Sequence, residues 1–143
     1  MLLFRPVGVK ELELIAHSAW KAFPPRLPEQ PIFYPVLNQA YAEQIARDWN
    51  TKDPASGYAG FVTCFELPDD YAAQFDRQVV GDQSHEELWV PAEDLEVLNS
   101  KIVGTRVCRR TVLRWRLQGG YRRHYPTPRW SSCNGSRLSM RFL

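Results

Sequence analysis

The sequence predicts an α+β protein, with a small domain at residues 1–104 followed by an arginine-rich extension at residues 105–143. Within the first part, short strand-like runs alternate with amphipathic, helix-like segments, which is typical of a mixed fold. At its end the charge changes sign abruptly. Residues 1–104 hold eight basic and all sixteen acidic side chains, a net charge of −8, whereas residues 105–143 hold ten arginines, no lysine and no acid.

Composition and length exclude several classes of protein and leave a small globular one. The 143 residues suit one domain with an appendage, and 44% hydrophobic with 24% charged residues exclude wholesale disorder and collagen. No apolar run approaches the ~18 residues of a membrane-spanning helix, and residues 1–6 lack the features of a signal peptide. Three widely spaced cysteines (Cys64, Cys108 and Cys133) argue against a disulfide framework or a zinc knuckle, so we expect a cytoplasmic protein.

The first expected elements are a strand, a helix and a loop. Residues 2–7 read as a strand stopped by Pro6 and Gly8. Residues 9–20 carry apolar side chains at helical spacing. Four prolines within residues 23–31 forbid a regular hydrogen-bond ladder and predict an extended loop.

A second strand and helix follow. Residues 32–37 are strand-like, although Pro35 confines them to an edge or a strand end. Asn38 is a favourable N-cap for a helix over roughly residues 39–49. Its expected apolar face consists of Tyr41, Ala42, Ile45, Ala46 and Trp49.

The rest of the domain is expected to be richer in strands. Residues 58–67 form a strand that ends before Pro68, residues 69–75 a short helical turn, and residues 78–85 a loop.

Residues 87–90 form the next strand, Pro91 suits the first position of a helix, and residues 102–104 begin a last strand. About five strands and three or four short helices result for residues 1–104.

Three separate segments carry side chains that could form a site. The first strand contains Arg5, the second strand-like segment contains Phe33 and Tyr34, and the late strand opens on Glu86 and Glu87.

In this order the segments resemble the ADP-ribosyltransferase-like fold of small bacterial toxin domains. There a first-strand arginine or histidine, a second-strand aromatic or serine and a late-strand glutamate line one NAD-binding cleft. The resemblance covers about residues 2–104 and implies a small split β-sheet with short helices. The chain is also similar to short bacterial proteins labelled "ADP-ribosylation/crystallin J1". We take that label as a family name only, because the length and clustered aspartates of the magnesium-binding glycohydrolases are missing.

The resemblance implies NAD as substrate and a role for each residue. Arg5 would hold a phosphate or the ribose beside nicotinamide. Tyr34, or else Phe33, would stack on the nicotinamide ring. Glu87 would bind the ribose hydroxyls and stabilise positive charge on C1′ as the glycosidic bond breaks.

The acceptor side would be formed by His85, Glu86 and the loop at residues 78–86. Many active relatives carry a glutamate or glutamine two positions before the catalytic glutamate, where this chain has His85. That departure leaves the acceptor open, whether a protein or a nucleic acid, and His85 could orient it or act as a base.

Plainer interpretations exist for the same residues. Arg5 could form a surface ion pair, Tyr34 could belong to the core, and Glu86 and Glu87 could lie on a solvated edge. Glu87 alternates with Trp89, so a Trp89 in the core would put Glu87 on the same inward face. A non-catalytic binding module, with the cleft repurposed or the proline-rich loop contacting a partner, therefore stays open.

Other chemistry finds no support in the pattern. The histidines His17, His85 and His124 show no metal-ligand spacing, so no metal site is expected. Neither a Gly-x-Ser-x-Gly nucleophile motif nor a glycine-rich phosphate loop occurs.

The extension at residues 105–143 has three interpretations. Arginine with interleaved Trp and Tyr is typical of a nucleic-acid-binding arm. The abrupt change in composition also fits an out-of-frame or recently acquired tail, and a packed element is the third alternative. Val107, Val112 and Leu113 could pair as strands, whereas little stable order is expected beyond about residue 118.

Overall fold

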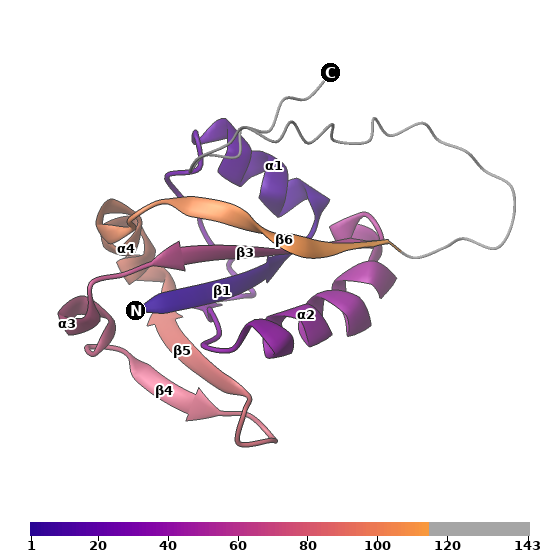
Figure 1. Cartoon of the computed structure of the whole chain (residues 1–143). Coiled ribbons are helices and arrows are strands. Elements are labelled where there is room, and N and C mark those ends of the chain that lie inside the picture. Colours follow the sequence, from indigo (N-terminus) through magenta and orange to yellow (C-terminus); the bar gives the residue numbers. More distant parts are fainter. Residues whose placement is uncertain (115–143) are drawn as a thin grey trace, which may run out of the picture.

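The computed structural model describes the backbone of residues 1–114 and the side chains of residues 1–108. It combines two small antiparallel three-stranded sheets with short helices, so the α+β class is confirmed (Figure 1). Residues 1–104 hold five strands and four α-helices. The number of strands equals the predicted one, but a strand at Asp76–Val79 replaces the one expected from residue 102. Three predictions concern residues outside the described part, wholly or for the most part. They are the nucleic-acid arm, the out-of-frame tail and the lack of order beyond residue 118.

The first sheet has the order β1-β3-β6, with β3 (Ala59–Glu66) between β1 (Leu2–Val7) and β6 (Thr105–Arg114). The pairing expected for Val107, Val112 and Leu113 is present, since all three lie opposite β3. The sheet therefore continues past residue 104.

Both faces of this sheet are covered by a helix (Figure 1). Helix α1 (Val9–His17) adds Leu12 and Ile15 to the larger core, and α2 (Gln39–Asp48) adds Ala42 and Ala46 to a smaller one. Alternation along the strands supplies the two faces. The larger core includes Leu3, Val7, Phe61 and Phe65, and the smaller one includes Phe4, Val62, Cys64 and Cys108.

The second sheet has the order β2-β5-β4, with β5 (Glu86–Pro91) between β2 (Ile32–Phe33) and β4 (Asp76–Val79). Val36 joins the two sheets. Its backbone N–H and C=O exchange hydrogen bonds of 2.8 and 2.9 Å with Phe4 of β1, and its other side forms a bridge to Glu87 of β5. The chain around residue 36 thus lies between β1 and β5.

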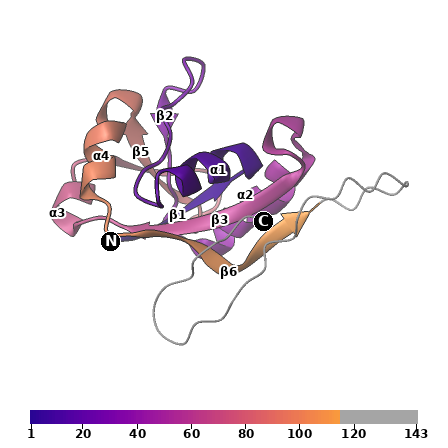
Figure 2. The same ribbon diagram turned by 90° about the horizontal axis from the view of Figure 1, so that it is seen from above.

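Short helical elements close the remaining sides. They are α3 (Asp69–Ala72), α4 (Leu95–Lys101) and 3₁₀ turns at Asn50–Lys52, Pro54–Ser56 and Ala92–Asp94. Figure 2, viewed from above, shows α4 and β5 on the same side of the molecule as β2. Among the residues the structure describes, no helix has both the length and the hydrophobicity needed to cross a membrane.

Several expected boundaries are corrected at the ends of elements. Helix α1 ends at His17 and not at Trp20, because Ala19 and Trp20 adopt left-handed backbone angles (φ 58° and 62°) that a helix does not continue through. The strand expected at residues 32–37 keeps only Ile32–Phe33, since Pro35 has no N–H for a ladder.

Three further predictions are corrected in the later half of the domain. Part of the expected loop at residues 78–85 is strand, because β4 pairs with β5 and places Gln78 opposite Glu87. Pro91 is the last residue of β5 and the N-cap of the 3₁₀ turn at Ala92–Asp94 that leads into α4, so the helical stretch begins one residue later than predicted. The last strand begins at Thr105 and not at residue 102, after Gly104 turns the chain with a φ of 73°.

Candidate functional site

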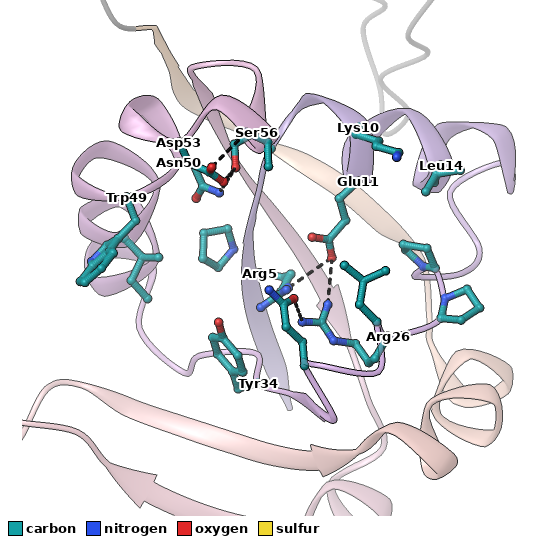
Figure 3. A pocket seen from close by; sticks show the side chains of 18 of the residues that line it. Arg5, Lys10, Glu11, Leu14, Arg26, Tyr34, Trp49, Asn50, Asp53 and Ser56 are labelled. Carbon is teal, nitrogen blue, oxygen red and sulfur yellow. Dashed lines mark hydrogen bonds and ion pairs between the residues drawn. The ribbon is translucent and has the colours of Figure 1, made fainter.

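A single cavity of about 840 Å³ collects three of the residues that the sequence singled out. Arg5, Tyr34 and Glu87 all line it, although they are far apart in the chain. Its other walls come from α1, the proline-rich loop, one side of α2 and the turns that follow α2 (Figure 3). Its volume falls within the roughly 300–1,000 Å³ that small-molecule sites occupy.

Backbone pairing explains why these three side chains meet. Arg5 follows Phe4, which pairs with Val36, and Val36 in turn bridges Glu87. Two further hydrogen bonds fix this segment on β5: Leu37 N–H donates to Glu86 O at 3.0 Å, and Leu88 N–H donates to Pro35 O at 2.8 Å. The segment that carries Tyr34 therefore sits between the strands that carry the other two residues.

Arg5 is almost fully buried and is held on three sides. Its Nε lies 3.4 Å from Glu11 Oε1, and its guanidinium carbon lies 4.9 Å from the ring centre of Tyr34 and 5.2 Å from that of Phe33. Contacts of this kind between a guanidinium and aromatic faces are attractive and hold the group in place. Tyr34 remains 37% exposed, so part of its ring is open to a ligand.

Glu87 is buried, at 8% exposed, and two donors hold its carboxylate. Tyr41 Oη donates to Oε1 at 2.8 Å, and Trp89 Nε1 donates to Oε2 at 2.9 Å. The interpretation as a solvated edge is thus wrong for Glu87. The expected reason for its burial is also wrong, because Trp89 is 41% exposed and acts as a hydrogen-bond donor at the surface.

Three other predicted site residues lie away from the cavity lining. Phe33 is fully buried in the core against Phe23, with ring centres 4.9 Å apart, so the ligand-stacking role is corrected to a packing role. His85 stacks on Tyr41, with ring centres 4.1 Å apart and planes 8° apart. Glu86 accepts from Leu37 through its backbone, and its side chain is not part of the lining.

Sequence reasoning missed Tyr41, Trp49 and Arg26 as lining residues. Tyr41 and Trp49 were assigned to the apolar face of a helix, yet Trp49 is 72% exposed and Tyr41 binds Glu87. Arg26 is the lone arginine of the proline-rich loop. A single arginine among prolines was the one sequence signal that could have marked Arg26 as a site residue. No local sequence pattern connects residue 26 or residue 41 with the strands that carry Arg5 and Glu87.

The charged side chains of the lining sum to zero but are unevenly distributed over it. Its cations are Arg5, Lys10 and Arg26, and its carboxylates are Glu11, Asp53 and Glu87. Figure 3 shows Arg5, Glu11 and Arg26 pointing toward one another, with Asn50, Asp53 and Ser56 together at another part of the lining.

Two ionisable groups of the lining have pKa values displaced from their ordinary values. Burial, together with the hydrogen bond to Glu87, raises the pKa of Tyr41, so this phenol stays a donor to higher pH than an ordinary tyrosine. Burial and then the charge of Arg5 lower the pKa of Arg26. No cluster of His, Cys, Asp or Glu within the described residues has a geometry that could hold a metal ion.

Comparisons with models of protein families, with curated proteins and with solved structures gave no match. A functional assignment therefore depends on the geometry of the cavity.

Proposed function

We propose that the protein binds NAD⁺ in this cavity and is an ADP-ribosyltransferase-like enzyme. It transfers ADP-ribose to a protein or nucleic-acid acceptor, or to water, through an oxocarbenium-like transition state. The observation that supports this most directly is the convergence of Arg5, Tyr34 and Glu87 on one cavity of about 840 Å³. The resemblance of their three sequence segments to the ADP-ribosyltransferase-like pattern is the reason for proposing ADP-ribose transfer as the reaction.

In the proposed reaction, the bond between C1′ of the nicotinamide ribose and the nicotinamide nitrogen breaks. Its electron pair goes to nicotinamide and leaves positive charge on C1′. The nucleophile then forms a bond to C1′ and releases its proton to solvent. With water as nucleophile, the products are ADP-ribose, nicotinamide and one proton.

Glu87 stabilises the positive charge that develops on C1′ and accepts from the ribose hydroxyls. A carboxylate offers about four acceptor positions, of which Tyr41 and Trp89 fill one on each oxygen. A carboxylate that is already in position when the cation develops lowers the activation free energy by a few kcal/mol, because no group has to reorient during the reaction. Tyr34 stacks on nicotinamide with the part of its ring that Arg5 leaves open, and Arg5 binds phosphate or ribose oxygens.

The proposed setting is a reducing cytoplasm. There the buried thiols of Cys64 and Cys108 would stay reduced.

The test is NAD⁺ consumption by the purified protein and by Glu87→Gln, which keeps the shape of the side chain and removes its charge. We expect turnover to fall by about a hundredfold or more, because a loss of a few kcal/mol of transition-state stabilisation has that size. Glu66→Gln, on an exposed strand position, is the matched control and should retain turnover. Equal turnover in wild type and Glu87→Gln, or none in the folded wild type, contradicts the catalytic role.

A second candidate function is a non-catalytic NAD-binding module on the same fold. It is favoured by the hydrogen bonds that already engage both oxygens of Glu87. NAD⁺ binding without consumption, in wild type and Glu87→Gln alike, is its expected result.

A further inference from the structure

Two arginine side chains share a single carboxylate in the wall of the cavity. Arg5 and Arg26 each expose only 6% of their side-chain surface, and Glu11 exposes 22%. Arg5 Nε lies 3.4 Å and Arg26 Nη1 3.9 Å from the same oxygen, Glu11 Oε1 (Figure 3). The three groups therefore carry a net charge of +1 where little water reaches them.

The remaining contacts of Arg26 do not balance this charge. Its Nη2 donates to the neutral Gln30 Oε1 at 2.9 Å, and its Nε is buried without a hydrogen-bond partner. The other carboxylates of the lining are engaged elsewhere, since Glu87 accepts from Tyr41 and Asp53 accepts from Ser56. A buried charge without full compensation destabilises a fold, so this part of the cavity is matched to an anion.

The loop that carries Arg26 is fixed at both ends. At its start, Phe23 packs against Phe33 and Phe65, and its backbone exchanges hydrogen bonds of 2.9 and 3.0 Å with the side chain of Asn99. At its end, Ala92 N–H donates to Pro31 O at 2.8 Å.

The prolines between these anchors restrict the backbone further. Arg26 is thus held in advance, which lowers the entropy that binding would otherwise cost.

We propose that Arg26 and Arg5 together form a subsite for a diphosphate group, with Glu11 holding the two guanidinium groups in place. Guanidinium forks match phosphate oxygens in pairs, and two forks match two linked phosphates. The net charge of +1 on the group formed by Arg5, Arg26 and Glu11 favours an anion. The connection of this subsite with NAD⁺ rests on the proposed function, whereas the binding of diphosphate does not.

The test measures thermal stabilisation and calorimetric affinity with inorganic pyrophosphate and with orthophosphate, at constant ionic strength. Wild type should bind pyrophosphate more tightly than orthophosphate. Arg26→Gln should weaken pyrophosphate binding about tenfold or more, the size expected when one charged hydrogen-bonded partner is lost. Arg47→Gln is the matched control, because Arg47 is exposed and pairs with Asp48 outside the lining.

The protein without ligand gives a second readout that separates binding from a merely structural role. Removing one of two like charges lowers their repulsion in the ligand-free protein, so Arg26→Gln should melt at the same temperature as wild type or higher. A structural role would instead lower the melting temperature.

If Arg26→Gln fails to fold, the claim that Arg26 carries an uncompensated charge in the ligand-free protein is overturned. Arg26→Lys, which keeps the charge but not the fork, then measures the binding role and should show intermediate affinity.

The inference is also overturned if pyrophosphate leaves wild type unchanged, or if it stabilises wild type and Arg26→Gln equally. NAD⁺ consumption by wild type is recorded separately. Pyrophosphate binding that needs Arg26, without any NAD⁺ consumption, upholds the subsite while the proposed enzymatic function fails.

Discussion

At the residue scale, the carboxylate of Glu87 is the best-defined group of the cavity. A donor from α2 and a donor from its own strand each bind one of its oxygens, at 2.8 and 2.9 Å. Tyr41 also stacks on His85, which lies at the start of β5 beside Glu86. His85 therefore packs against the ring that donates to Glu87, and its acceptor-side role stays a prediction.

Tyr41→Phe tests this arrangement directly. The variant keeps the ring and its stacking on His85 but removes the hydrogen bond to Glu87. A hydrogen bond to a charged group contributes about 1.5–3 kcal/mol, and we expect the lower part of that range because Tyr41 is only partly buried. NAD⁺ turnover should fall about tenfold as the carboxylate loses its orientation.

The same variant should change the alkaline limit of stability. Because the folded protein raises the pKa of Tyr41 above its ordinary value of 10.0, this phenol contributes stability that is fully present below about pH 10 and is lost as pH rises further. Urea unfolding between pH 8 and about pH 11 should therefore show a smaller alkaline loss for Tyr41→Phe than for wild type. Tyr58→Phe, at an exposed tyrosine, is the control; identical pH profiles for all three proteins would rule out the contribution of Tyr41.

At the element scale, the packing of α2 against β3 sets the position of Tyr41. Gly60 of β3 lies directly beneath α2, and a Cβ at this position would come within 2.5 Å of the backbone oxygen of Ala46. Only a residue without a side chain allows this approach, so the sequence of β3 fixes the distance between the helix and the sheet.

Gly60→Ala should consequently destabilise the protein by about 2 kcal/mol, since the helix must move away from the strand. A displaced α2 also moves Tyr41, so NAD⁺ turnover should fall in the same variant. Urea unfolding measures the first effect. The sign of the change in the free energy of unfolding decides the test. An alanine that fits without strain stabilises a chain by about 0.4–1 kcal/mol, and a gain of that size would contradict the close packing of α2 on Gly60.

Local signals in the sequence predicted the elements that have a marked start or stop. Asn38 caps α2 as expected, its side chain accepting from the backbone of Ala40 and Tyr41. Strand β4 was missed because all four of its residues are exposed, which leaves no alternation of apolar and polar side chains to recognise.

The candidate site could be predicted only in part, for a related reason. Arg5, Tyr34 and Glu87 stand in segments with a recognisable order along the chain, and all three line the cavity. Tyr41 and Arg26 depend on contacts with Glu87 and Glu11 that cross between elements. Such contacts follow from tertiary packing, which no local pattern of residues encodes.

At the scale of the whole molecule, the cavity exists because two small sheets meet at Val36. This one residue pairs with β1 on one side and with β5 on the other. The meeting of the two sheets brings charged side chains together. In a closed core these charges would repel or desolvate one another. The open volume of about 840 Å³ leaves room for a ligand that balances their charge. NAD⁺, the proposed ligand, has a nicotinamide and an adenine ring, two riboses and a diphosphate, and the proposal assigns these to the aromatic, carboxylate and guanidinium groups of the lining.

Calorimetric titration of NAD⁺ tests this match most directly. Glu87→Gln provides the background, so that turnover does not consume the ligand. We expect one NAD⁺ bound per chain, and loss of binding when either Arg5→Gln or Tyr34→Ala is added. The absence of binding by the folded protein, or affinity that both additional substitutions leave unchanged, would contradict a single NAD⁺ site formed by these three elements.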